Sequence, residues 1–296
     1  MISFLFHHLF QICAKLSGHG SKTAEWVTDI GNELCQILNL VFTDKEAVDT
    51  LLPVTMKIED RYLDNGIPVP YAIFTDRGCC RVDGESSMQK LFPRFTQMGV
   101  PYLLDFFHWI NRWDAAVTDD HHPMYPDFKS GLAGCGLAYY DADIRLLAKA
   151  IRAGMPKTNL TDIQVITKYA SKDDKQKYLR RTTIGVQATF ERVEKLIEIL
   201  SGPAGLDENG VPLFRSGEIE KVWQAQQRHI ICFQDPPGVN LYTDIRTVVR
   251  NGVELTERRT ARGTNSLESF HGKLPGMVPG PSAAAQPLQV TSCTIF

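Results

Sequence analysis

Apolar and polar positions in the first third of the chain are arranged in a way that predicts three consecutive strands. Residues 2–14, 24–30 and 34–43 are apolar runs with β-compatible composition. Gly31 followed by Asn32 is typical of a hairpin turn between the second and the third run. We therefore expect the chain to begin with three strands, the last two joined by a tight turn.

Helices and strands alternate along the next segment. Asp44 can cap a helix that runs to about Asn65, because its apolar positions recur near helical spacing. Two further apolar runs predict strands that end at Asp76 and near Asp105, with a short helical piece at residues 85–92 between them. The order βββαβαβα is typical of a layered α/β fold of the ribonuclease H type, with a mixed sheet and helices on its faces.

Helical patterns dominate the middle of the chain. Residues 141–154 predict one helix, residues 161–200 a long helical run, and residues 217–233 a third helix. The last segment is rich in Pro, Gly, Ala and Ser. The sequence thus predicts four parts: the N-terminal part of the core (1–137), an all-helical insertion (138–233), a loop with the final core helix (234–274) and a poorly ordered tail (275–296).

Composition narrows the class of protein without identifying a function. The chain has 296 residues, 43% hydrophobic and 22% charged, which is typical of globular proteins. Its net charge of −2 gives no argument for nucleic-acid binding and leaves room only for a local basic face. Seven cysteines without any CxxC spacing indicate neither a disulfide framework nor a zinc ribbon, and they favour a cytoplasmic or nuclear protein.

The apolar N-terminus does not predict a signal peptide. It lacks a basic segment, and His7 and His8 interrupt the apolar run. No later run of about 18 apolar residues follows, so we expect no transmembrane helix.

One candidate metal ligand stands at the end of a predicted strand. Asp76 follows an apolar strand and precedes the turn residue Gly78, and binding crevices of open α/β sheets form at such strand ends. Its carboxylate suits a hard cation. The alternative is a turn aspartate that accepts hydrogen bonds from nearby backbone amides.

A second candidate pair lies where a strand gives way to a helix. Asp105 and His108 are three residues apart, which places both on one face of the helix start. The pair could ligate a metal or brace the strand–helix corner. A capping aspartate beside a core histidine explains the pattern equally well.

A third candidate lies near the C-terminal end. Ser266 can cap a helix, which places Glu268 in the first turn, where the helix dipole stabilises an anion. His271 is three residues further on and on the same side. The alternative is an ordinary first-turn glutamate.

Two polar clusters have simpler interpretations. Asp119, Asp120, His121 and His122 resemble a metal cluster, but we interpret them as a solvated turn. A group of basic residues could bind the phosphates of DNA, although a solvated helix face fits their pattern better. Its members are Lys168, Lys172, Lys175, Lys177, Arg180 and Arg181.

Taken together, five segments resemble DDE-type transposases of eukaryotic cut-and-paste elements. The segments are TAEWVTDIGNE, FTDRGCC, LLDFFHWINRW, RHIICFQDPPGVNLYT and RGTNSLESFHGKLPG. The resemblance runs from about Lys15 to Pro281, and the order and spacing of the segments carry it. It implies a ribonuclease H-like core with a helical insertion before the last catalytic helix. It also implies Mg²⁺ or Mn²⁺ as cofactor, DNA as substrate and a nuclear location, allows a homo-oligomer, and leaves no role for a membrane or a small-molecule substrate.

The resemblance also implies roles for the candidate residues. In this family the second catalytic acid closes the fourth strand, which matches Asp76, and the third opens a helix after the insertion, which matches Glu268. The Asp-x-x-His corner after the fifth strand matches Asp105 and His108, which brace the site, and His271 lies near it. Such carboxylates hold two cations about 3.5–4 Å apart, which activate the attacking oxygen and stabilise the leaving oxygen.

The chain departs from the family pattern on its first strand. The first catalytic aspartate belongs there, but no Asp or Glu precedes Glu25. His7 or His8 could ligate a metal, although histidine suits Zn or Mn better than Mg. We therefore interpret the chain as a truncated or domesticated transposase core that does not cleave DNA. The alternatives are an enzyme that still cleaves and joins DNA, a non-enzymatic DNA- or protein-binding module, and an unrelated α/β protein.

Overall fold

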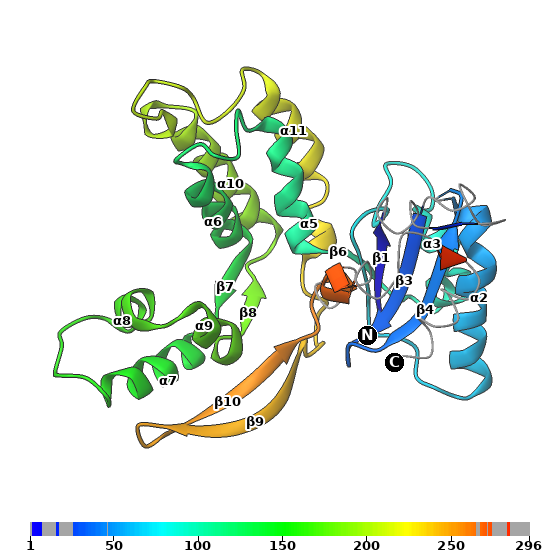
Figure 1. Cartoon of the computed structure of the whole chain (residues 1–296), viewed down its shortest axis with the longest axis horizontal. Helices are drawn as coiled ribbons and strands as arrows, with labels where there is room; N and C mark the ends of the chain where they lie inside the picture. The colour runs from blue at the N-terminus through cyan, green and yellow to red at the C-terminus, as the bar shows by residue number, and fades with distance from the viewer. Residues whose placement is uncertain are drawn as a thin grey trace. The chain divides into compact units, whose positions relative to one another are not determined.

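The chain forms two compact units (Figure 1). The computed structural model describes residues 2–7, 16–17, 26–45, 47–264, 267–270, 272–273 and 283–284, of which 2–7, 16–17 and 283–284 are described as backbone. Unit 1 consists of residues 1–111 and 263–296, and unit 2 of residues 112–262. Both units contain helices and strands, so the protein is of the mixed α/β class that the sequence predicts.

Unit 1 contains a five-stranded sheet in the order β4-β3-β1-β5-β6. Strand β3 is antiparallel to β1 and to β4, whereas β5 is parallel to β1 and β6 is parallel to β5. The strands are β1 (Ile2–His7), β3 (Trp26–Asn32), β4 (Ile37–Thr43), β5 (Ile73–Thr75) and β6 (Tyr102–Leu104). A separate parallel pair joins β2 (Leu16–Ser17) to β11 (Ala283–Ala284).

The turn between β3 and β4 differs from the prediction. Gly31 and Asn32 belong to β3, and the turn is made by the residues that follow them. The Asn32 side chain accepts hydrogen bonds from the amides of Leu34 and Gln36, both at 3.0 Å, and so closes the turn. Gly31 serves packing instead, because a Cβ atom there would lie 2.7 Å from a side-chain carbon of Leu267.

Helices cover one face of this sheet with an apolar core. They are α2 (Val48–Asp64), α3 (Ser87–Leu91) and α4 (Pro93–Gln97). Ile30 and Ile73 from the sheet pack with Ile58, Phe92 and Phe95 from the helices and their junction. Burial of such side chains stabilises the unit by about 1.5–3 kcal/mol each.

Helix α2 begins later than the sequence predicts. Its N-cap position is Ala47, which supplies no side-chain hydrogen bond, so Asp44 does not cap it. Pro53 lies inside the helix, in its second turn. The helix ends at Asp64, and Gly66 then adopts a positive φ of 64°, as expected for a residue just beyond a helix.

Unit 2 is built from helices, two short paired strands and one long hairpin. Its helices are η2 (Arg112–Ala116), α6 (Tyr125–Gly136), α7 (Asp141–Arg152), α8 (Asp162–Tyr169), α9 (Lys172–Tyr178), α10 (Val186–Leu200), η3 (Pro203–Gly205), α11 (Glu218–Gln227) and η4 (Ile231–Phe233). Its strands are β7 (Leu137–Tyr139), β8 (Arg181–Thr183), β9 (Tyr242–Arg250) and β10 (Val253–Thr260).

The division into units differs from the predicted parts of the chain. The first boundary falls after Asn111 rather than after residue 137. Helices η2 and α6 belong to unit 2 because they pack against α11 and α10. Trp113, Phe128 and Trp223 form an aromatic cluster at this contact, with ring centroids 5.8 and 6.1 Å apart. Unit 2 then continues to Arg262, beyond the predicted end of the insertion.

The region predicted as a helical insertion and a loop contains strands. The run 161–200 is interrupted by β8 and divides into α8, α9 and α10. Strands β9 and β10 form an antiparallel hairpin where the sequence predicts a loop. Asn251 and Gly252 turn this hairpin with φ values of 53° and 77°, which is the signature of a type I′ turn.

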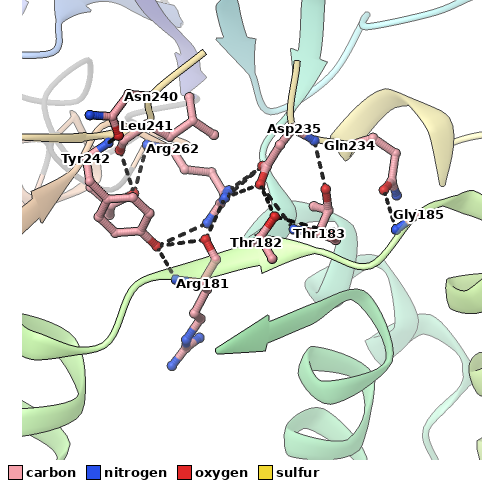
Figure 2. Close-up of polar contacts among 11 residues, drawn as sticks. Arg181, Thr182, Thr183, Gly185, Gln234, Asp235, Asn240, Leu241, Tyr242 and Arg262 are labelled. Atoms are coloured by element: carbon pink, nitrogen blue, oxygen red, sulfur yellow. Dashed lines mark hydrogen bonds and ion pairs between the residues drawn. The ribbon is translucent and has the colours of Figure 1, made fainter. Parts of the chain in front are cut away.

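A polar network holds the base of the hairpin to β8 (Figure 2). Asp235 accepts hydrogen bonds from the Thr183 amide at 3.1 Å and from the Thr182 hydroxyl at 3.2 Å. Its carboxylate also accepts three hydrogen bonds from the Arg262 guanidinium, one from Nε at 3.0 Å and two from Nη2 at 2.7 Å. The Tyr242 hydroxyl accepts a hydrogen bond from the Arg181 amide at 2.7 Å. The network thereby joins β8, the segment at Asp235 and the base of the β9–β10 hairpin, which are distant in the sequence.

No helix in the described part of the chain combines the length and the apolar character needed to cross a bilayer.

Candidate functional site

The candidate site lies within unit 1, where β6 gives way to helix α5 (Phe106–Asn111). Asp105 stands between them, and its amide donates to the Thr75 carbonyl at 2.8 Å, which continues the pairing with β5. Its carboxylate accepts a hydrogen bond from the Phe107 amide at 2.6 Å and so caps the helix. A second oxygen accepts from the amide and the hydroxyl of Thr264, both at 2.6 Å.

Gly263 allows the chain to approach this carboxylate. A Cβ atom at Gly263 would lie 2.7 Å from Oδ2 of Asp105, which is closer than real Cβ contacts come. Gly263 also has a φ of 83°, a conformation that other residues rarely adopt. Two independent constraints therefore require glycine, and both serve the contact between Thr264 and Asp105.

His108 lies between two carboxylates. Its Nε2 is 3.1 Å from Oε1 of Glu268, and its Nδ1 is 3.7 Å from Oδ2 of Asp105. Burial alone would lower the pKa of His108, but Asp105, Glu268 and the charge of Asp76 together raise the pKa to about 9. The imidazole is therefore protonated at neutral pH.

Asp105 remains ionised despite its burial. Burial alone would raise its pKa, but the His108 imidazolium and the hydrogen bonds from Thr264 hold the pKa below its usual range. Its side chain is 3% exposed. A negative charge thus lies 3.7 Å from Nδ1 of His108.

Glu268 reaches the site from the helical segment 267–270. The amides of Leu267 and Glu268 both donate to the Thr264 carbonyl, at 2.9 and 3.0 Å, so Glu268 lies in the first turn as the sequence predicts. Leu267 packs over Gly31 of β3, which places the segment on the sheet. The Glu268 side chain is 31% exposed and therefore accessible to a ligand.

Asp76 follows the last residue of β5 and borders the same site. Its charge contributes to the raised pKa of His108. Oδ2 of Asp76 is 3.8 Å from Nε of Arg77, and the Asp76 side chain is 10% exposed. Glu268 therefore contacts His108 directly, whereas Asp76, 192 positions earlier in the sequence, acts on the same imidazole through its charge alone.

The structure adds one carboxylate that sequence reasoning missed. Asp29 lies in β3 and is fully buried. It pairs with Leu5 of β1, and the neighbouring pair Phe4 and Thr75 places Leu5 beside Asp76. Directly paired residues share a face of a sheet, so Asp29 and Asp76 lie on one face, about 10 Å apart between Cα atoms. The only signal in the sequence was an acidic residue within an otherwise strand-like run.

The donor set fits a divalent cation. Asp76 and Glu268 supply carboxylate oxygens, which Mg²⁺ and Mn²⁺ prefer. His108 is cationic at neutral pH and already pairs with Glu268. A divalent cation bound by these carboxylates would therefore have to displace this positive charge.

Asp119, Asp120 and His121 form a separate group that could hold a metal ion. All three are exposed, and Nδ1 of His121 lies 2.6 Å from Oδ1 of Asp120. The predicted solvated turn is correct for these three residues but wrong for His122. That side chain is buried, and its Nε2 lies 3.1 Å from the Val211 carbonyl oxygen.

The six basic DNA-binding candidates divide into two groups. Lys177 pairs with Asp173 at 2.7 Å, and Arg180 pairs with Asp143 at 2.9 Å. Arg181 donates to the Tyr139 hydroxyl at 2.9 Å. These three stabilise unit 2, whereas Lys168, Lys172 and Lys175 take part in none of these contacts.

Some candidates lie outside the described residues. These are His8, Ser266 and His271. His7 is described as part of the β1 backbone only.

Comparisons with protein-family models, with curated proteins and with solved structures found no match for this chain.

Proposed function

We propose that the chain is a transposase-derived protein with a ribonuclease H-like core that binds a divalent cation through Asp76 and Glu268. The observation that carries the proposal concerns two residues that are far apart in the sequence. Glu268 contacts the His108 imidazole, and the charge of Asp76 acts on the same imidazole.

The topology of the unit 1 sheet supports the ribonuclease H-like part of the proposal. Counted along the chain without β2, the five strands lie in the order 3-2-1-4-5, and the second strand alone runs opposite to the others. A mixed sheet with helices on its faces is what a fold of the ribonuclease H type implies. Asp76 directly follows the fourth strand and Asp105 the fifth, which are the positions that the resemblance to DDE transposases implies.

The substrate class that follows is DNA, and the location is the nucleus. Asp76 and Glu268 would hold the cation, which would supply Lewis-acid chemistry toward the oxygens of a phosphodiester. Asp105 would hold the imidazole of His108 in place, and His108 would orient Glu268 through the 3.1 Å contact.

We further propose that the chain does not cleave DNA. A site for two cations needs carboxylate ligands on more than one side of the cations. Strand β1 (Ile2–His7) cannot supply one of them, because it contains no Asp or Glu. The backbone register places Leu5 beside Asp76, at the position where an acid is missing.

Cation binding tests the first part of the proposal. Calorimetric titration with Mn²⁺ should show that Asp76→Asn combined with Glu268→Gln weakens binding at least tenfold. Asp119→Asn combined with Asp120→Asn is the control, because it removes the exposed group in unit 2. Loss of binding in the control alone, or equal binding in all three proteins, would contradict the proposal.

Plasmid nicking tests the second part. The wild-type chain should not nick supercoiled DNA in Mg²⁺ or Mn²⁺, whereas Leu5→Asp should gain nicking that depends on Asp76. Nicking by the wild-type chain would overturn the inactive interpretation.

A DNA-cleaving enzyme is the second candidate function, and Asp29 favours it. Its carboxylate lies on the same face as Asp76, with one strand between them, and the span of about 10 Å matches two cations about 4 Å apart with a ligand on each side. In that case the wild-type chain should nick DNA, the Asp29→Asn variant should not, and the Asp119→Asn variant should nick DNA like the wild type.

A further inference from the structure

Two consecutive cysteines follow the end of β5 in unit 1. Cys79 is buried, with 7% of its surface exposed, and Cys80 is half-buried. Their Sγ atoms lie 3.9 Å apart. A disulfide bond needs about 2.0 Å between the two sulfurs, so the residues are neighbouring thiols that face each other.

The turn after β5 brings the two sulfur atoms together. In an extended strand, consecutive side chains point to opposite faces, so adjacent cysteines do not normally present their sulfurs to one ligand. Here the Thr75 hydroxyl donates a hydrogen bond to the Arg77 carbonyl at 2.6 Å, and Gly78 adopts a φ of 71°. The approach of the Cys79 and Cys80 sulfurs is therefore a property of this turn, and the sequence spacing alone does not indicate it.

The same turn is anchored to helix α3. The Gly78 carbonyl accepts a hydrogen bond from the Met88 amide at 3.4 Å, and Met88 is fully buried in the core of unit 1. A Cβ atom at Gly78 would lie 3.4 Å from the Cβ atom of Ser87. The backbone that carries the two thiols is thus held by β5 on one side and by α3 on the other, which fixes the direction of the sulfurs.

The distance between the sulfurs matches two ligands of one tetrahedral metal ion. With Zn–S bonds of about 2.3 Å and tetrahedral angles, two thiolate sulfurs lie about 3.8 Å apart, close to the 3.9 Å in this turn. Cys79 and Cys80 also belong to one of the two groups of side chains, within the described part of the chain, whose ligand atoms are close enough to hold a metal ion. The pair is therefore arranged as one edge of a coordination tetrahedron.

This pair differs in its chemistry from the carboxylates of the candidate site. Thiolates are soft ligands that favour Zn²⁺, whereas Mg²⁺ and Mn²⁺ favour carboxylate oxygens such as those of Asp76 and Glu268. Asp76 precedes Cys79 by only three positions. The two kinds of donor should nevertheless take different ions.

We propose that Cys79 and Cys80 bind Zn²⁺ through two thiolates, at a structural site separate from the carboxylates of Asp76 and Glu268. Each thiol releases its proton to the solvent when its sulfur binds the ion, so no oxidant or reductant takes part. The two thiolates fill two of the four positions of the ion, and donors outside the turn fill the other two. The bound ion fixes the turn between β5 and α3. The proposal does not depend on the proposed function.

Cobalt titration of the full chain, kept reduced and freed of metal by a chelator, tests the proposal. Co²⁺ in a thiolate site shows sulfur-to-metal charge-transfer absorption, which carboxylate ligands do not give. The wild-type chain should show this absorption. Stoichiometric Zn²⁺ should abolish it, whereas excess Mg²⁺ should leave it unchanged.

Cysteine variants locate the site. Cys79→Ala combined with Cys80→Ala should bind Co²⁺ at least tenfold more weakly and lose most of the charge-transfer absorption. Cys35→Ala combined with Cys135→Ala is the control, because it removes the same number of thiols elsewhere, one exposed and one buried. The control should bind Co²⁺ like the wild type.

Alkylation of the wild-type chain gives a second measurement that does not require a variant to fold. Zn²⁺ should slow the reaction of Cys79 and Cys80 with iodoacetamide at least tenfold, because a sulfur bound to the ion is not available as a nucleophile. The exposed Cys35 should react at the same rate with and without Zn²⁺. Mass spectrometry of proteolytic fragments measures each rate.

Each result decides the question. Loss of binding in the Cys79 and Cys80 variant with a normal control, or protection of these two thiols by Zn²⁺, supports the proposal. Absence of the charge-transfer absorption in the wild type, equal loss in both variants, or alkylation of Cys79 and Cys80 that Zn²⁺ does not slow overturns it. Glu268→Gln should keep the thiolate absorption, so failure of the carboxylate site and failure of this site are distinguishable.

Discussion

Asp105 and His108 illustrate how neighbours decide the charge of single residues. Asp105 is buried yet ionised, because Thr264 donates two hydrogen bonds to it and His108 supplies a positive charge. His108 is protonated because the surrounding carboxylates outweigh the effect of its burial. The two charges stabilise each other, and this coupling makes the site sensitive to pH.

Folding stability should fall when His108 loses its proton. The pKa rises from 6.5 to about 9 on folding, so the stabilising contribution is fully present below pH 6.5 and is lost as the pH passes 9. The loss amounts to about 3 kcal/mol in the free energy of unfolding. Urea unfolding at pH 6 and pH 9.5 measures it, and His108→Gln, which has no proton to lose, should show a smaller difference between the two values.

A direct titration completes this test. The imidazole signals of His108 in NMR spectra should titrate near pH 9. A midpoint near 6.5 would show that the carboxylates do not hold the proton.

At the scale of elements, the stability of the β9–β10 hairpin depends on a few anchoring side chains more than on the composition of its strands. Most of β9 is exposed, and among the strands that the structure describes it pairs with β10 alone. The hairpin is held by Val253 and Leu255, which enter an apolar core with side chains of α7 and α8, and by the Asp235 network at its base. Isolated two-stranded hairpins are marginally stable in water, so these anchors determine whether it forms.

Asp235→Ala should therefore destabilise unit 2. It leaves the guanidinium of Arg262, which is 9% exposed, without its carboxylate. Breaking a buried pair in this way costs about 3 kcal/mol in the free energy of unfolding. Asp244→Ala removes an exposed partner of Arg258 and should cost at most about 1 kcal/mol. Chemical denaturation followed by circular dichroism compares the two, and equal losses would contradict the structural role of Asp235.

At the scale of the whole molecule, unit 2 is inserted between the two segments of the chain that form unit 1. Unit 1 is built from both ends of the described chain, whereas unit 2 is one continuous segment. Unit 2 has an aromatic cluster around Trp113 and a second core between α7, α8 and β10. It therefore contains what a domain needs to fold by itself.

Residues 112–262 expressed alone should fold. The fragment should unfold cooperatively on heating, and its amide NMR spectrum should be well dispersed. A non-cooperative transition or a collapsed spectrum would show that unit 2 needs unit 1.

The amino-acid sequence determined the features that depend on neighbouring residues. It predicted the mixed α/β class, the strand that ends before Asp76 and the helix that Asp105 caps, because strand periodicity and caps are short-range patterns. It did not reveal that Gly31 makes room for Leu267, that Asp29 lies opposite Leu5, or that Asp235 meets Arg262. Those contacts join residues that are distant in the chain, so only the strand order and the packing of helices on the sheet decided them.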